Sequence, residues 1–282
     1  MCRLAAAALA IGWAAGFAGS ALGKERPAVT LSAEEIVAKN VAARGGQEAW
    51  RRIQTMTWTG HIESAHVPVP HMRFMLEQKR PNKTRFELNT MSEKTVRVFD
   101  GAQGWMERPL RNGLQELQAY TSEELRFAQA GQGIDGPLID HAAKGNVVSV
   151  EGLDEIEGHK CYRLEVRLAS GERDRLWVDA KTFLEIRYDR FTAGPVRLLG
   201  RVMSVVYRDY KSFDGVKMPT VIERSAEAGD RPDRMVIEQV ALNSPLDNST
   251  FAKPGTARRR SALHWQPREL SGVHEGLEAA SQ

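Results

Sequence analysis

The sequence predicts a mainly β protein with some helix (α+β), in which an open β-barrel of about eleven strands wraps around two or three helices. Between about Thr55 and Leu242, apolar and polar residues alternate in one short segment after another, which is typical of strands with one buried face. Only two longer segments carry helix-start signals. About eleven strands spaced about 4.8 Å apart give a sheet about 53 Å wide. Two helices, each about 10–12 Å across, are too narrow to cover that width, so the sheet is expected to curl.

The two helix signals lie before the first strand and in the middle of the chain. Ser32 followed three residues later by Glu35 is a capping box, and Gly45-Gly46 ends the helix that it opens. A short amphipathic turn follows at 47–53. The segment 121–124 opens a second helical run through Ala130, and a glycine-rich loop at 131–136 follows it.

The strand segments fall into two blocks, before and after this second helix. The blocks could form one sheet or two, and one sheet is favoured because no Pro/Ser linker separates them. Asp-Gly pairs at 100–101 and 214–215 mark turns between strands. Several large apolar residues alternate with charged ones and are expected on the inner face. They are Met56, Trp58, Phe74, Leu76, Phe86, Leu88, Trp105, Leu164, Val166 and Ile186. Two interpretations remain open: these side chains fill a packed core, or they line an apolar cavity.

The chain begins with the three-part pattern of a secretory signal. Arg3 precedes an apolar run of small residues at 4–18, and small residues at 19–23 place cleavage before Lys24. The apolar run is shorter than the roughly 20 residues that span a bilayer. The sequence therefore predicts a signal peptide at 1–23, one domain at 24–254 and a polar, basic, poorly ordered tail at 255–282. Export into the periplasm is expected.

Composition and motifs argue against several classes of function. The net charge of +3 favours neither nucleic acid nor strongly acidic partners. Cys161 is the only cysteine after the signal peptide, so a buried core thiol is expected. His61, His66 and His71 surround the first hairpin, but their spacing matches no standard metal-ligand pattern. The sequence has no Gly-x-Ser-x-Gly, Walker or His-Glu-x-x-His motif, so neither enzyme activity nor a metal or other cofactor is expected.

Several segments together resemble the outer-membrane lipoprotein-sorting, or LolA-like, proteins. The resemblance covers residues 33–254 and depends on the order of its motifs rather than on one of them. The motifs lie at 33–46, 56–60, 80–86, 99–105, 134–140, 178–184, 207–219 and 243–251. Cys2 precedes the apolar run and is no acylation site, which matches the soluble carrier of the family rather than an anchored acceptor.

The resemblance implies an incomplete antiparallel β-barrel around helices, with an apolar cavity for acyl chains. It implies a periplasmic carrier that moves an acylated lipoprotein or another lipid towards the outer membrane. Possible partners include an inner-membrane transporter complex, and membrane contact is expected to be transient. An alternative is a periplasmic sensor or assembly factor that uses the same half-barrel to bind a protein. Because a carrier must also release its cargo, Gly131, Gly133 and Gly136 are candidate hinges of a lid.

Overall fold

The computed structural model describes residues 30–64, 72–90, 93–110, 113–131, 133–192, 201–225 and 231–254. In this part of the chain, thirteen strands form one antiparallel sheet, with three α-helices and a short 3-10 helix. The strands are β1 (Thr55–Glu63), β2 (Met72–Lys79), β3 (Lys83–Thr90), β4 (Glu93–Phe99), β5 (Gly104–Pro109), β6 (Gln115–Ala119), β7 (Val147–Ile156), β8 (His159–Arg167), β9 (Arg173–Asp179), β10 (Glu185–Thr192), β11 (Arg201–Phe213), β12 (Val216–Ser225) and β13 (Asp233–Leu242). The sheet exceeds the expected eleven or so strands, because the exposed edge strand β6 lacks apolar alternation.

The helices begin where the sequence places them. Ser32 caps α1 (Ala33–Ala43), and Thr121 caps α3 (Ser122–Gln129), each in a complete capping box with the glutamate three residues later. The amphipathic turn at 47–53 contains α2 (Gln47–Arg52). The 3-10 helix η1 (Asn248–Phe251) follows the last strand. No helix in the described residues is long and apolar enough to span a membrane.

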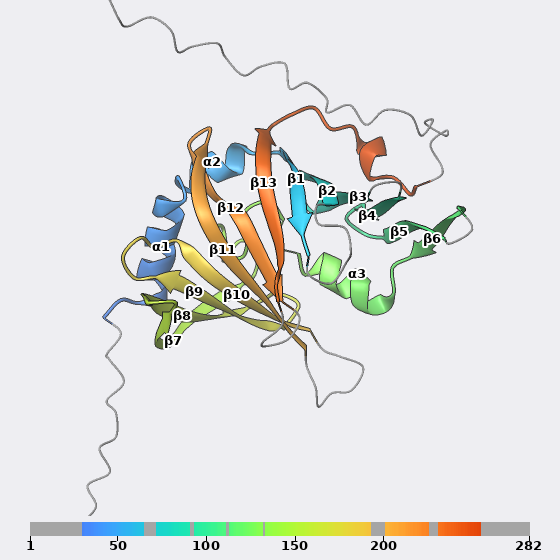
Figure 1. Cartoon of the computed structure of the whole chain (residues 1–282). Coiled ribbons are helices and arrows are strands. Elements are labelled where there is room, and N and C mark those ends of the chain that lie inside the picture. The colour runs from blue at the N-terminus through green and yellow to red at the C-terminus, as the bar shows by residue number, and fades with distance from the viewer. Residues whose placement is uncertain are drawn as a thin grey trace, which may run out of the picture.

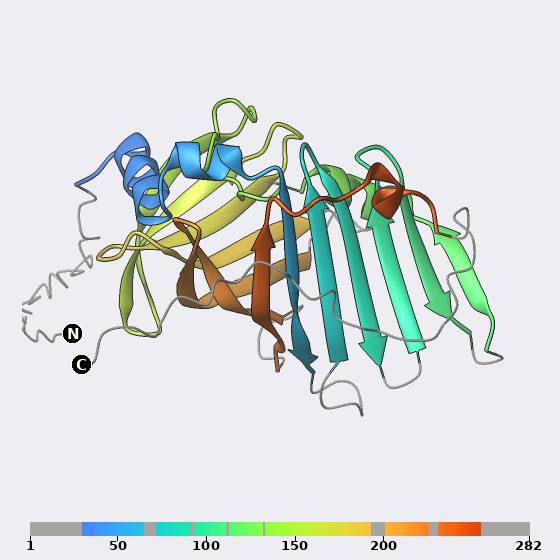
Figure 2. The same ribbon diagram turned by 90° about the horizontal axis from the view of Figure 1, so that it is seen from above.

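The sheet consists of two meanders joined at the first and last strands. Its order is β6-β5-β4-β3-β2-β1-β13-β12-β11-β10-β9-β8-β7, so β1 pairs with β13. Figures 1 and 2 show a strongly curved half, β7 to β12, with α1 and α2 beside it, and a flatter half, β1 to β6. The strands do not close into a ring: β6 and β7 remain as edges. The fold is therefore an open, incomplete antiparallel barrel with helices.

Two core clusters fill the interior near α1 and α2. Ile36 and Val37 of α1 pack against Leu164, Val166 and the strands around them. Trp50 of α2 packs against Met56, Val216 and Met218. These large side chains are almost fully buried. The helices thus plug one end of the curved sheet by ordinary apolar burial.

A third cluster lies on the other face of the flatter half. Val96 and Val98 of β4 pack against Leu246 and Phe251, the latter in η1, and Phe251 is fully buried. Figure 2 shows η1 outside the sheet, over the flatter half. The outward-facing valines are therefore covered by the chain after β13. Both faces of this half of the sheet carry apolar contacts.

Candidate functional site

The chain between the two edge strands crosses the opening of the sheet. β6 ends at Ala119 and β7 begins at Val147, so 120–146 must bridge the two edges. Figure 1 shows α3, within this segment, in the space between the two halves of the sheet. α3 itself contains no buried residue. This helix is therefore a cover over the concave side rather than a part of the core.

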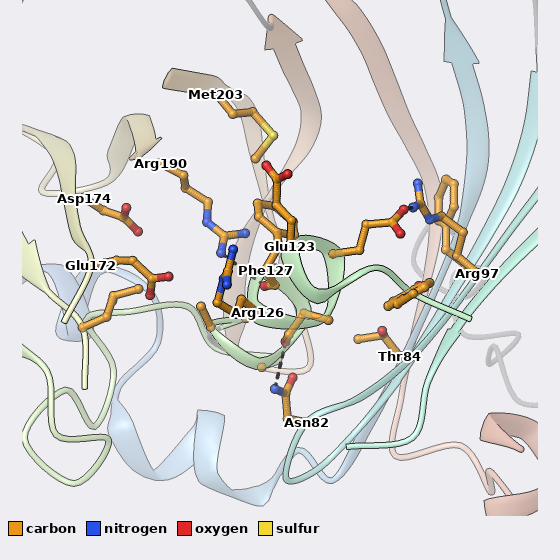
Figure 3. A pocket seen from close by; sticks show the side chains of 18 of the residues that line it. Asn82, Thr84, Arg97, Glu123, Arg126, Phe127, Glu172, Asp174, Arg190 and Met203 are labelled. Atoms are coloured by element: carbon orange, nitrogen blue, oxygen red, sulfur yellow. Dashed lines mark hydrogen bonds and ion pairs between the residues drawn. The ribbon is translucent and has the colours of Figure 1, made fainter. Parts of the chain in front are cut away.

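A cavity of about 620 Å³ lies between α3 and the sheet. Its walls are α3 with the following loop, β3 and β4 on one side, and β9 to β12 on the other (Figure 3). The lining residues are Gln78, Asn82, Thr84, Phe86, Arg97, Tyr120, Glu123, Glu124, Arg126, Phe127, Ala128, Ala130, Gly131, Gly133, Leu168, Glu172, Asp174, Arg190, Phe191, Met203 and Arg224. The volume lies in the range of about 300–1,000 Å³ that small-ligand sites occupy.

The lining combines apolar and charged side chains. Phe86, Phe127, Leu168 and Met203 provide the apolar surface. Phe191 reaches the cavity with its backbone, whose N–H donates to Asp174, while its ring contacts Arg175 on the other face of the sheet. Four arginines and four carboxylates line the same space. The family resemblance implied an apolar cavity. The cavity in the structure is instead amphipathic, because charged side chains line it beside the apolar ones.

Side chains of two strands and of the turn between β2 and β3 hold α3 at three points. Arg97 of β4 forms an ion pair with Glu124. The Asn82 side-chain amide donates to the carbonyl oxygens of Ala128 (3.2 Å) and Gln129 (3.4 Å). The Arg190 guanidinium lies 3.8 Å from the centre of the Phe127 ring. These are polar contacts at a partly solvated surface, where each contributes little, so α3 is held lightly.

The chain after Gly133 is anchored far more firmly. Leu138 and Ile139 are fully buried, and Ile134 belongs to the core cluster around Trp50. Asp135 is also buried and accepts from Arg80 (2.6 Å) and from Lys144 (2.5 Å). Burial lowers the pKa of Lys144, and the charge of Asp135 acts in the opposite direction. The boundary between lightly and firmly held chain therefore lies at about residues 131–133.

The three candidate hinge glycines differ in their surroundings. Gly131 and Gly133 line the cavity at this boundary, and Gly133 has a positive φ of 66°. Gly136 also has a positive φ, but its carbonyl oxygen accepts from Lys144 within the anchored segment. A hinge at Gly131 and Gly133 stays a prediction, and Gly136 serves as an internal comparison.

The expected inner-face residues divide into several groups. Phe86 lines the cavity, and Phe74 is buried and stacks on it with ring centres 6.1 Å apart. Met56, Trp58, Leu164 and Val166 pack in or against the two core clusters under α1 and α2. Leu76 pairs with Phe86, and Leu88 pairs with Phe74, so both share the inner face and are half-buried. Ile186 lies at the register shift between Glu185 and Arg187 and is half-buried.

Trp105 belongs to the opposite face. It pairs with Val98, whose side chain packs against Leu246 and Phe251 outside the barrel. Residues directly opposite each other in a sheet share a face. Trp105 therefore does not contribute to the cavity that α3 covers.

The cysteine and the histidines lie away from this cavity. Cys161 is fully buried, and desolvation raises the pKa of its thiol to about 11. The His61 side chain contacts Glu238 and Glu63. His66, His71, the signal segment at 1–23 and the tail at 255–282 lie outside the described residues. Among the residues that the structure describes, no group of three His, Cys, Asp or Glu side chains is arranged to hold a metal ion.

The sequence pattern did not identify the charged lining residues. Arg97 lies between Val96 and Val98, and nothing in this alternation shows which face is inner. In the structure η1 covers the valines, so Arg97 faces the cavity. Phe127, whose ring contacts Arg190, was missed because no alternating pattern marks it.

Comparison with known proteins adds the fold family. Neither a model of a known protein family nor a curated protein sequence matches the chain. Among solved structures, a LolA superfamily protein of Nitrosomonas europaea is similar, with a TM-score of 0.53 and 14% identity over 79% of this chain and 98% of that one. The chain has the LolA-like fold. A DUF1329 family protein of Desulfovibrio piger shares it, with a TM-score of 0.50 and 13% identity over 78% of this chain and 97% of the other. At these identities the likeness concerns the LolA-like fold alone, and function must be argued from the cavity.

Proposed function

We propose that the protein is a periplasmic carrier that binds the acyl chains of a lipid or lipoprotein beneath α3 and moves this cargo towards the outer membrane. The observation that carries the proposal is the cavity of about 620 Å³ under a lightly held helix. A carrier needs both features, because it must shelter a hydrocarbon chain from water and its cover must open to load and release that chain.

Energetics support an apolar binding site of this kind. Burial of a methylene group contributes about 0.8 kcal/mol, so a chain of a dozen methylenes loses about 10 kcal/mol when it leaves a membrane for water. A carrier must offset this loss by burying the chain against its own apolar side chains. Phe86, Phe127 and Met203 offer such surface, and the thioether of Met203 adapts to ligands of different shape. The proposal involves binding without turnover, and cleavage of segment 1–23 would release the carrier into the periplasm.

The test begins with the full chain, exported from a Gram-negative host and purified from the periplasm without detergent. Native mass spectrometry and lipid extraction would then identify what accompanies it. We expect lipid or lipoprotein at about one copy per protein. A stoichiometric protein partner with no lipid would instead support the sensor or assembly factor.

A matched pair of variants locates the ligand. Ala128 lines the cavity, whereas Ala102 lies in an exposed turn. We expect Ala128→Trp to occupy the cavity and lose the lipid, while Ala102→Trp keeps it. Equal lipid content in two folded variants would place the lipid elsewhere and contradict the proposal.

A further inference from the structure

Three arginines from three different elements face the cavity without an ion pair. They are Arg126 of α3, Arg190 of β10 and Arg224 of β12. Within the described part of the chain, none of the three is within ion-pair distance of a carboxylate. Arg126 and Arg224 are exposed and Arg190 is half-buried, so a ligand in the cavity has access to all of them.

The register of the sheet brings Arg190 and Arg224 to the same face. Arg190 pairs with Met203 on β11, and Arg224 pairs with Val205, two residues further along that strand. Side chains two residues apart on a strand point to the same side. Arg190 and Arg224 therefore flank Met203 from the two neighbouring strands, and Figure 3 shows Arg190 and Met203 directed towards α3.

The carboxylates around the cavity are mostly engaged elsewhere. Asp174 accepts from the Tyr188 hydroxyl (2.5 Å) and from the Phe191 backbone N–H (3.1 Å), and its charge also attracts Arg190 without an ion pair. The Glu124 carboxylate binds Arg97 and accepts from the backbone N–H of Thr121, and Glu172 accepts from Ser170. Two other acids remain close: Asp233 attracts Arg224 from the opposite position on β13 without a hydrogen bond, and Glu123 is exposed in the first turn of α3.

The positive charges of this cluster act on one another. Desolvation lowers the pKa of Arg224, the charge of Asp233 raises it, and the positive charges of Arg97 and Arg190 lower it. A guanidinium stays protonated in spite of such effects, so the repulsion between the arginines persists. An anion between the arginines would reduce this repulsion.

We propose that the cavity selects an amphiphile with a phosphate-bearing head, held by Arg126, Arg190 and Arg224. The hydrocarbon chain would lie along Phe86, Phe127 and Met203. The fork of a guanidinium matches phosphate oxygens in paired hydrogen bonds, and such charge-assisted bonds are stronger than neutral ones. This inference rests on the proposed function and narrows its cargo from any acylated molecule to an anionic one.

The experiment compares ligands that share a chain but differ in the head. Decyl phosphate, decanol and inorganic phosphate would each be titrated into the delipidated full-length protein by calorimetry below the critical micelle concentration. We expect decyl phosphate to bind at least tenfold more tightly than decanol, with inorganic phosphate far weaker than either. Higher salt should weaken the binding of decyl phosphate and inorganic phosphate, which are charged, but not that of decanol.

Arginine variants assign the contact. Arg190→Gln and Arg224→Gln should each lower the affinity for decyl phosphate on the order of tenfold, as expected for loss of hydrogen bonds to a charged group. Neither variant should change the affinity for decanol. Arg52→Gln, an exposed change on α2 outside the cavity, is the control and should alter neither ligand. Circular dichroism would verify that each variant is folded.

The outcomes separate the two proposals. Equal affinity for decanol and decyl phosphate, or no effect of either arginine variant, would overturn the head-group assignment and leave the carrier proposal intact. Inorganic phosphate binding as tightly as decyl phosphate would point to a plain anion site and also overturn it. Failure of all three ligands to bind would remove the carrier proposal itself.

Discussion

The ion pair of Arg44 and Glu185 provides a quantitative test of how the plugged end of the barrel is held together. Arg44 follows α1 directly and donates to Glu185 of β10 (3.1 Å) and to the carbonyl oxygen of Asp135 (3.1 Å). Its guanidinium also lies 4.4 Å from the centre of the Trp50 ring. The two charged side chains are only 6% and 8% exposed. This single residue therefore joins α1, α2, the sheet and the anchored loop after α3.

Arg44→Met retains the aliphatic stem but leaves the Glu185 carboxylate buried and unpaired. Removal of one partner from a buried ion pair typically costs about 3–5 kcal/mol. The lost hydrogen bond to the Asp135 carbonyl adds about 1 kcal/mol. We therefore expect the free energy of unfolding to fall by about 4–6 kcal/mol. The double variant Arg44→Met, Glu185→Leu should recover most of this loss, since well-packed apolar replacements of buried pairs are often neutral or stabilising.

Urea unfolding of the mature chain, followed by circular dichroism, would measure both variants, with Arg52→Gln as the surface control. Two results would refute the reasoning. One is a loss below about 1 kcal/mol for Arg44→Met, which would mean that water reaches Glu185. The other is a double variant less stable than the single one, which would mean that burial of the unpaired Glu185 carboxylate carries no large cost.

Three further predictions concern the lid, the thiol and acid stability. Asn82→Ala and Glu124→Gln weaken the contacts of α3 and should raise the dissociation rate of decyl phosphate several-fold, since each contact contributes roughly 0.5–1 kcal/mol. The double variant Gly131→Ala, Gly133→Ala should lower this dissociation rate, whereas Gly136→Ala should not change it. Stopped-flow dissociation rates of the double variant equal to those of wild type would contradict a hinge. Cys161, with a pKa of about 11, should resist a thiol reagent at pH 8 until urea unfolds the chain, whereas rapid labelling of folded protein would contradict its burial. Hydrogen bonds from Arg51 lower the pKa of Asp140 below its usual 3.8, so its stabilisation is present above that pH and lost as the pH falls through the lowered value. The stability difference between wild type and Asp140→Asn should therefore shrink below about pH 4, and a constant difference across pH 3–7 would exclude this linkage.

Local signals in the sequence predicted the elements well. The capping boxes at Ser32 and Thr121 depend only on residues three apart, and both helices begin there. Alternation of apolar and polar residues predicted most strands because it reports a one-sided environment along a single strand. The pattern of alternation does not mark β6, since an exposed edge strand buries neither face.

The sequence by itself determined a curved antiparallel sheet with capped helices, because caps, turns and alternation act between residues close in the chain. Only the tertiary structure decided which face of β4 and β5 is inner. Val98 and Trp105 face outward, since the chain after β13 returns to cover them, and Arg97 consequently faces the cavity. The arginine cluster has the same origin. Arg126, Arg190 and Arg224 are far apart in the sequence and meet only because β10 and β12 flank β11 while the bridging segment brings α3 over them.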